Sequence, residues 1–560
     1  MRVWSIVSLL LLSHTALFSW CAVHKSICVD EGAHLSAGIA YWRWHELSIY
    51  DLSPPLMRYW DSLPAYVAGC RIPEAKSLRD ESPSARSWIY YDRFEQENRD
   101  RLFRYVIFGR FMQLPISLAL ALGIFAVARR LYGDWPGVLA CGIYCLEPNI
   151  LAHASTLGTD LGITATVFAT AIAWQRFLET GKTLPLLLTG LALGAAHSIK
   201  FNAPMIFPVL LIMVFVMRRP RIGLLGLAVV GIMSYVLMNL CYGYQLFGRP
   251  LNWFGFQSSL MKHVAAILPG GFRVPFSQFL VEGFDAQKWE ADGAYLTAFF
   301  GKAHFGSDWR YYPFMLLVKT PLIIVVLVAW SAISMFRKRP NRMEIALLLT
   351  SVGIFAGMEF LTNVNLGIRY LLPIYPPAIV LAARAVRPGW TWLLTALALE
   401  TLLVAPQFHS YANPLAGHLY IPDQDYGQSL TDVRDWMRKH DLQEMTLLSV
   451  GWTDPSIYGI HYRKLEAPCS EYVAISKAYL TGIPWAFHPE GRYVFVRRWR
   501  ELQQTKPVAD LGGFEIFRAE DTGPEPWVRV MRKWNELLDD PLMVPIEGFQ
   551  AGGKARDNQQ

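Results

Sequence analysis

Charged residues are scarce in this chain. Asp, Glu, Lys and Arg together make up 17% of its 560 residues, whereas hydrophobic residues make up 53%. The mean hydropathy is positive, at +0.24. This balance excludes an ordinary soluble protein, because apolar runs of about 20 residues recur along most of the chain and are typical of transmembrane helices.

The chain also lacks the motifs of several other classes. Its seven cysteines form neither a metal-binding motif nor a disulfide framework, and whether Cys28 and Cys70, which share one loop, form a pair stays open. No Asn begins an Asn-x-Ser/Thr sequon, which favours a bacterial protein. The absence of a glycine-rich phosphate loop argues against nucleotide binding. The net charge of +7 does not indicate nucleic-acid binding, because the basic residues lie in short loops between apolar runs.

Long apolar segments are what the chain has in abundance, and they predict an all-α polytopic membrane protein with about 11 transmembrane helices. The predicted spans are residues 9–23, 105–128, 135–151, 161–178, 184–199, 202–217, 222–242, 313–335, 344–361, 371–386 and 389–406. A cleavable signal peptide is the alternative for the first segment, but no small-x-small cleavage site follows its apolar core.

Basic residues distinguish the two sides of the predicted membrane. They cluster in alternate loops, whereas the short loops between hold only Lys200 and Arg369. By the positive-inside rule the N-terminus is therefore cytoplasmic, and two long loops, 24–104 and 243–311, lie outside. We expect a multi-pass protein of the cytoplasmic (inner) membrane whose chain after the last span is extracytoplasmic.

The composition turns polar after residue 406. We expect a membrane domain at 1–406, a small extracytoplasmic α/β domain at 407–548 and a disordered tail at 549–560. Within the second domain, alternation and amphipathic periodicity predict short strands at 446–450, 492–499 and 513–519 and helices at 429–440 and 525–538.

Adjacent acids open the first outer loop. Asp30 and Glu31 follow the first span by a few residues, a helix-like stretch continues from Ala33 to Trp44, and a Pro-Pro-Leu turn leads to Arg58. Placing a carboxylate at the edge of a bilayer costs free energy, so this pair of acids suggests a functional site. The alternative is that Asp30 caps the following helix and Glu31 is solvated.

The predicted topology brings polar residues from different loops to one membrane depth. A cavity that holds acids and bases together suits a reaction on a phosphate, because cations hold the anion while a carboxylate takes a proton. Each residue also has a structural interpretation: the lysines can snorkel, His153 can be packed, and Asp160 can cap the fourth span. The residues are Asp30, Glu31, Arg58, His153, Asp160, Lys200, Lys319, Asn365, Arg369 and Tyr370.

The Asp-Glu pair followed by Pro-Pro-Leu resembles the GT-C membrane glycosyltransferases of the protein mannosyltransferase and aminoarabinose transferase type. Further similar pieces follow in order over about residues 30 to 430: Thr159-Asp160, GLALGAAHSIKF (190–201), YYPFMLLVKTP (311–321), NLGIRYLLPIYP (365–376) and DYGQSL (425–430). The resemblance implies many helices around an outer-face cavity, where a sugar passes from a polyprenyl-phosphate donor to an extracytoplasmic acceptor, which can be a lipid, a glycan or a protein.

The resemblance also implies roles for individual residues. Asp30 would be the general base of an inverting transfer and Glu31 its orienting neighbour. A divalent cation between Asp30 and Asp160 stays open, because spacing alone does not argue for it. The lipid phosphate would be held by Arg369, Lys200, Lys319 and Tyr370, and the further cavity residues would be Asp160, Arg58, His153 and Asn365.

Two other function classes compete with this interpretation. A transporter or flippase for the same lipid-linked saccharide would also need charges at membrane depth, but transporters usually show paired halves and midplane sites. A scaffold whose outer domain binds envelope components would leave the Asp-Glu pair unexplained. Membrane lipids are partners in every case, and no nucleic acid is expected.

Overall fold

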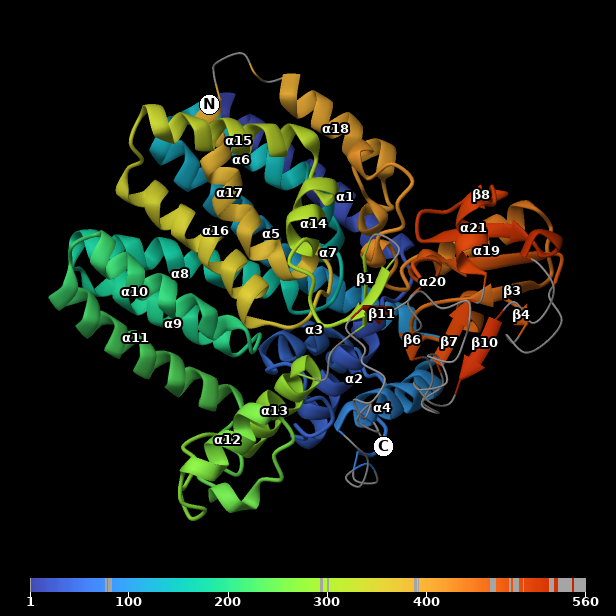
Figure 1. Cartoon of the computed structure of the whole chain (residues 1–560), viewed down its shortest axis with the longest axis horizontal. Coiled ribbons are helices and arrows are strands. Elements are labelled where there is room, and N and C mark those ends of the chain that lie inside the picture. The colour runs from blue at the N-terminus through green and yellow to red at the C-terminus, as the bar shows by residue number, and fades with distance from the viewer. Residues whose placement is uncertain are drawn as a thin grey trace.

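The structure is a computed structural model. It describes residues 2–75, 78, 83–292, 296–299, 302–386, 390, 392–463, 470–482, 485–486, 493–496, 498–522, 528–531 and 546–547. Helices form one large body, and a smaller part that contains most of the strands lies beside it (Figure 1). The mainly helical fold with a small C-terminal α/β part agrees with the fold class predicted from the sequence.

Helices cover every segment that the sequence predicts as a span. They are α1 (Arg2–His24), α5 (Leu102–Tyr132), α6 (Asp134–Leu146), α7 (Pro148–Ala154), α8 (Asp160–Thr180), α9 (Thr183–His197), α10 (Ile206–Val216), α11 (Pro220–Cys241), α14 (Tyr311–Lys319), α15 (Leu322–Arg337), α16 (Arg342–Leu361), α17 (Tyr375–Ala382) and α18 (Trp392–Val404). The first helix belongs to the bundle: Phe18 is fully buried, and His14 hydrogen-bonds to Ser117 of α5 at 2.8 Å.

Five of the described helices are long and apolar enough to cross a membrane, and a sixth crossing results if α14 and α15 together make one bent span. Shorter apolar helices cover residues 183–197, 203–216 and 392–404. The chain is therefore a multi-pass membrane protein by helix length and composition, and the count of about 11 spans stays a prediction.

Proline breaks helices that the sequence suggested were continuous. The predicted eighth span, 313–335, is two helices that meet at 116° beside Pro321. The predicted third span, 135–151, is interrupted between α6 and α7, where Glu147 is extended before Pro148. A proline restricts the residue before it to extended conformations, which is the physical reason for both breaks.

The two long loops carry helices of their own. In the first loop they are α2 (Val29–Trp44), α3 (Leu56–Val67) and α4 (Pro83–Asn98), and in the second loop α12 (Ser259–Ile267) and α13 (Gln278–Asp292). Strands β1 (Leu296–Phe299) and β2 (Lys302–Phe305) follow α13 as an antiparallel pair. The sequence predicted α2 but not the other helices.

The C-terminal part contains a five-stranded sheet in the order β4-β3-β5-β9-β8. Its strands are β3 (Met445–Leu448), β4 (Tyr462–Arg463), β5 (Tyr472–Ser476), β8 (Ala509–Asp510) and β9 (Phe514–Arg518). The central β5 runs parallel to β3 and antiparallel to β9, with Val473 opposite Phe517. Helices α19 (Leu430–Lys439), α20 (Lys477–Leu480) and α21 (Trp499–Gln504) accompany the sheet.

One predicted helix is wrong. Within 525–538 the described residues form strand β10 (Val528–Met531), which pairs antiparallel with β7 (Tyr493–Val496), itself paired with β6 (Trp485–Ala486). The segment VRVM alternates in polarity, so its period of two fits a strand as well as the longer sequence fits an amphipathic helix. The predicted tail, 549–560, lies outside the described residues, and β11 (Ile546–Glu547) pairs parallel with β2.

A shared core joins the C-terminal domain to the first loop. Buried side chains of α2 and α4, such as Leu35 and Phe94, belong to the same cluster as Val433 of α19, Leu447 of β3 and Ile516 of β9. This arrangement explains how the C-terminal domain can position the residues that begin α2, where the adjacent acids lie.

Candidate active site

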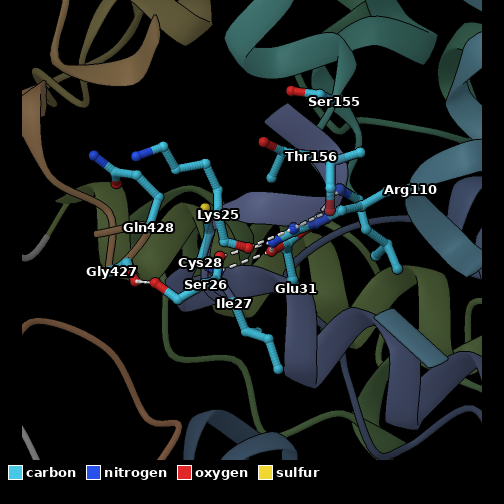
Figure 2. Close-up of polar contacts among 12 residues, drawn as sticks. Lys25, Ser26, Ile27, Cys28, Glu31, Arg110, Ser155, Thr156, Gly427 and Gln428 are labelled. Atoms are coloured by element: carbon cyan, nitrogen blue, oxygen red, sulfur yellow. Dashed lines mark hydrogen bonds and ion pairs between the residues drawn. The ribbon is translucent and has the colours of Figure 1, made fainter. Parts of the chain in front are cut away.

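The chain just before α2 is held by the C-terminal domain. We call residues 25–29 the strap. Within it, the backbone N–H of Ser26 donates to the carbonyl of Gln428 at 3.0 Å, and that of Val29 donates to the carbonyl of Tyr426 at 2.7 Å. The Ser26 hydroxyl donates to the carbonyl of Gly427 at 2.7 Å (Figure 2). These bonds fix where α2 starts and therefore where its first acids point.

Glu31 is enclosed by donors. Arg110 of α5 contacts both of its oxygens, with Nε–Oε1 at 2.8 Å and Nη2–Oε2 at 2.5 Å (Figure 2). The backbone N–H groups of Leu157 and Cys28 donate to the same carboxylate, each at 2.8 Å. Glu31 is fully buried, so the alternative that it is merely solvated is wrong.

Arg110 connects the adjacent acids to the strap. Besides Glu31, its guanidinium donates to the carbonyls of Ala22, Lys25 and Ser26 at 2.7–2.8 Å. The guanidinium is planar and buried, and each of these partners accepts a hydrogen bond from it. It therefore holds Glu31 and the strap in a fixed relative position. Arg110 lies inside the predicted second span, where sequence reasoning did not assign it a role.

The Asp30 side chain contacts Arg369 and not Arg110, the partner of Glu31. Its Oδ2 lies 2.6 Å from Nη1 of Arg369, although 339 residues separate the two in the sequence. The Asp30 side chain is 37% exposed, and it caps no helix, since the residue before α2 is Cys28. Arg369 stands in the 3-10 turn Ile368–Ile374, just after Gly367, whose φ of +84° favours glycine.

A second ion pair lies on the same wall. Asp160, at the start of α8, has its Oδ1 2.6 Å from Nζ of Lys200, and its Oδ2 lies 3.8 Å from Nδ1 of His153. Nζ of Lys200 also stands 4.2 Å from the ring centroid of Tyr370. Lys200 is buried and engaged, so it does not simply snorkel, and Asp160 forms this pair rather than a helix cap.

These groups line one cavity of about 520 Å³. Its lining also includes the apolar side chains of Met205, Met358 and Leu260 of α12. The predicted site residues that line it are Asp30, Glu31, His153, Asp160, Lys200, Arg369 and Tyr370.

Three predicted residues lie elsewhere. Lys319 is buried 3.5 Å from Asp423 and donates to the carbonyl of His409 at 2.7 Å. Arg58 donates to the carbonyl of Tyr50 at 2.7 Å, and the Asn365 side-chain oxygen accepts from the N–H of Asp308 at 2.6 Å. None of the three lines the cavity, so the expectation that all the predicted residues share one cavity fails for them.

The cavity includes residues that sequence reasoning missed. His34 and His409 line it, and burial lowers the pKa of His34 to about 4 and that of His409 well below its ordinary value, so both are neutral near pH 7. Burial similarly lowers the pKa of His153 to about 4. Tyr426 also lines the cavity, with its ring centroid 5.4 Å from Cζ of Arg369. Tyr426 lies within the DYGQSL stretch, which was the one signal available.

Two open questions from the sequence have structural answers. Cys28 and Cys70 are both free thiols, so they do not pair. Among the described residues, no group of three or more His, Cys, Asp or Glu side chains is arranged to hold a metal ion. Asp30 and Asp160 are instead each neutralised by a basic side chain, so a divalent cation between them does not fit this site.

Comparison with known proteins finds a family model that matches part of the chain, and solved structures that are similar to it. The family model described as dolichyl-phosphate-mannose-protein mannosyltransferase matches residues 107–241. No curated protein sequence matches the chain. ArnT from Cupriavidus metallidurans bound to undecaprenyl phosphate has a TM-score of 0.48 and 11% identity, over 93% of this chain and 99% of that chain. Archaeal oligosaccharyltransferase AglB from Archaeoglobus fulgidus, in complex with an inhibitory peptide and a dolichol-phosphate, has a TM-score of 0.42 and 12% identity, over 95% and 75%.

The matched segment runs from α5 to α11 and includes Arg110, Asp160 and Lys200. Asp30 and Arg369 lie outside it. Over residues 107–241 the chain is thus similar to the glycosyltransferases of the protein mannosyltransferase type, which confirms the resemblance predicted from the sequence motifs.

Proposed function

We propose that this protein is a membrane glycosyltransferase that moves a sugar from a polyprenyl-phosphate donor to an extracytoplasmic acceptor. The observation that carries the proposal is the 2.6 Å contact between Asp30 and Arg369 on the wall of a 520 Å³ cavity, which sets a carboxylate beside an anion-binding group. A cavity of this size falls within the range of small-molecule sites and can hold a sugar with its phosphate.

The cations of the cavity fit a lipid phosphate. Arg369 keeps one guanidinium donor, Nε, without a partner among the described residues. A phosphate oxygen satisfies such a donor, and charge-assisted bonds of this kind contribute about 1.5 to 3 kcal/mol each. Lys200 provides a second positive charge in the same cavity. The neighbouring Met205, Met358 and Leu260 offer an apolar surface for the first part of the polyprenyl chain.

Asp30 is the group best placed to take the acceptor's proton. When a donor phosphate engages Arg369, it competes with the Asp30 carboxylate for the guanidinium and frees that carboxylate for the acceptor hydroxyl. The acceptor oxygen then forms a bond to the anomeric carbon while the bond from that carbon to the phosphate oxygen breaks. The proton passes to Asp30, and the lipid phosphate leaves with the bonding electron pair. A single displacement of this kind inverts the anomeric centre.

Glu31 serves the site through position rather than contact with a reacting atom. Its hydrogen-bond partners among the described residues are Arg110 and two backbone N–H groups, all of which belong to the protein's own framework. Because Asp30 and Glu31 are adjacent on α2, a fixed Glu31 fixes the direction in which Asp30 points. We therefore assign Glu31 as a positioning residue.

The proposed setting follows from the charge pattern of the sequence. Basic residues in alternate loops favour a cytoplasmic N-terminus in the inner membrane. The cavity and the C-terminal domain would then open to the extracytoplasmic side, where a lipid-linked donor presents its sugar.

The test is transfer from a panel of lipid-linked sugars by the purified protein in proteoliposomes. We expect free polyprenyl phosphate to accumulate with the wild type and not with Asp30→Asn. The matched control is Asp134→Asn, because Asp134 is an exposed acid paired with Arg129 and does not line the cavity. Movement of intact donor across the bilayer without release of lipid phosphate would identify a flippase and contradict the proposal.

A further inference from the structure

The second loop exposes apolar side chains next to the last residue of a membrane span. We call residues 244–274 the α12 loop. Its exposed apolar residues include Trp253 at 55%, Ile267 at 68% and Phe272 at 43% of their full accessibility. Large exposed apolar surfaces on a folded element mark an interaction site.

The α12 loop has a defined internal structure. Its two ends are joined by backbone hydrogen bonds, from Val274 N–H to the Arg249 carbonyl at 3.0 Å and from Leu251 N–H to the Phe272 carbonyl at 2.8 Å. The buried carboxylate of Asp285 in α13 accepts from the Ser258 hydroxyl at 2.6 Å and so anchors the start of α12. The exposed side chains are therefore presented by a fixed scaffold.

Helix α12 has two distinct apolar faces. Met261 and Ala265 pack inward on the small core of Leu251 and Val274. A second set, Leu260, Val264 and Ile267, follows the spacing of one helix face, and Leu260 and Ile267 are exposed. Val264, which lies between them on this face, is half-buried.

The charge of this region has one sign. No Asp or Glu occurs between residues 243 and 281, while Arg249, Lys262 and Arg273 do. Cζ of Arg249 lies 4.3 Å from the ring centroid of Trp253, and such Arg and Trp pairs suit the headgroup region of a bilayer. An apolar helix face with basic and aromatic neighbours is typical of an element that lies in the membrane interface.

The position of the loop agrees with its composition. Helix α11, one of the candidate spans, ends at Cys241, and the α12 loop follows within a few residues (Figure 1). Leu260, on the exposed face of α12, also lines the cavity. The same face thus borders both the surroundings of the helical bundle and the candidate active site.

We infer that the α12 loop lies in the lipid–water interface, with Leu260, Val264 and Ile267 against the acyl chains and Arg249, Lys262 and Arg273 at anionic headgroups. Through Leu260, this membrane-embedded face forms the lipid side of the cavity. The inference concerns the membrane contact itself and holds whether or not the chain transfers a sugar.

The experiment uses nitroxide labels on the whole protein in vesicles of phosphatidylcholine and phosphatidylglycerol. One variant carries the label at Ile267→Cys and the matched control at Ala266→Cys, an exposed position about 100° further round the same helix. Unmodified protein gives the background from native cysteines. We expect the ratio of oxygen to nickel-chelate accessibility to be several-fold higher at 267 than at 266, because oxygen concentrates in lipid and the chelate in water.

Equal ratios at the two positions would overturn the inference. So would a label at 267 that is shielded from both relaxing agents, because that result indicates a protein partner or a second copy of this chain. Vesicles without phosphatidylglycerol provide the charge test: the label at 267 should lie at shallower depth there, and an unchanged depth would contradict the assigned role of the basic residues.

Discussion

Asp30 and Glu31 are neighbours in the sequence and have opposite environments. Asp30 is partly exposed on the cavity wall, whereas Glu31 is fully buried against Arg110. Asp30→Asn keeps the shape and removes the base, so turnover should fall by roughly 10²-fold or more. Donor binding should be retained or tightened, since Arg369 loses its competing carboxylate. Transfer rates and donor titrations on the same preparation check both parts, and normal transfer would remove Asp30 from the mechanism.

Glu31→Gln should act on stability instead. It leaves the buried guanidinium of Arg110 without its charged partner, and losing one member of a buried pair costs about 3 to 5 kcal/mol in the free energy of unfolding. Thermal unfolding of the purified protein measures the loss, with Asp134→Asn, at an exposed ion pair, as the near-neutral control. The double change Glu31→Gln with Arg110→Gln should recover part of it, and no recovery would contradict the pairing.

Arg369→Ala should weaken binding of the donor rather than slow the chemical step. The loss of a desolvated phosphate contact predicts a decrease of about 1.5 to 3 kcal/mol in donor binding free energy. Arg369→Lys keeps the charge without the guanidinium fork, so it should restore only part of the affinity. Equal donor binding by wild type and Arg369→Ala would place the phosphate elsewhere.

Sequence reasoning could find the charged residues that line the cavity but not the residues that support them. Asp30, Asp160, Lys200 and Arg369 are charges at membrane edges, and their cost alone suggests function. Arg110 lies inside the predicted second span, and nothing in the sequence shows that its side chain donates to the carbonyls of the strap. For Tyr426 the DYGQSL stretch was the one signal, and tertiary packing brings its side chain to the cavity.

Helix breaks and short strands limited the prediction of elements. Apolar periodicity continues across Pro148 and Pro321, so each pair of helices was interpreted as one span. The central strand β5 was missed because Tyr472–Ser476 is a short run with little alternation. The long helices α1, α5, α8, α11 and α16 were predictable, because their length and hydropathy leave few alternatives.

Helix α4 contacts the C-terminal domain through a titratable group. Glu95 is buried, accepts the Asp454 N–H at 3.0 Å, and has its pKa raised by burial to about 7. The folded protein therefore holds a proton that the unfolded chain releases near pH 4.5. Stability from this group is present at low pH and is lost as pH rises from about 4.5 to 7.

Glu95→Gln should remove that dependence. At pH 8 the variant should be more stable than wild type by on the order of 3 kcal/mol, and the two should agree below pH 4.5. Unfolding midpoints across this pH range measure the difference in stability between the variant and the wild type. The other titrating groups are the same in both proteins, so their contributions cancel. A constant difference at every pH would show that Glu95 does not titrate in this window.

At the scale of the whole molecule, the side on which the C-terminal domain lies depends on the last helix. Helix α18 has 13 residues, which gives about 20 Å at 1.5 Å per residue, less than the roughly 30 Å of a hydrocarbon core. Flanking residues must complete the crossing if this helix spans the membrane. The position of α18 therefore decides whether residues 407–548 share a side with the N-terminus.

The charge pattern predicts that α18 does cross. Reporter fusions after Arg387 and after Phe408 should then give opposite compartments, with the first cytoplasmic. A fusion after Arg337 is the cytoplasmic control, since the basic residues that follow α15 mark that side. The same compartment for both test fusions would remove the crossing. Because the strap is bonded to Tyr426, Gly427 and Gln428, a cytoplasmic result for both fusions would also move Asp30 and its cavity to the cytoplasmic side together with the C-terminal domain.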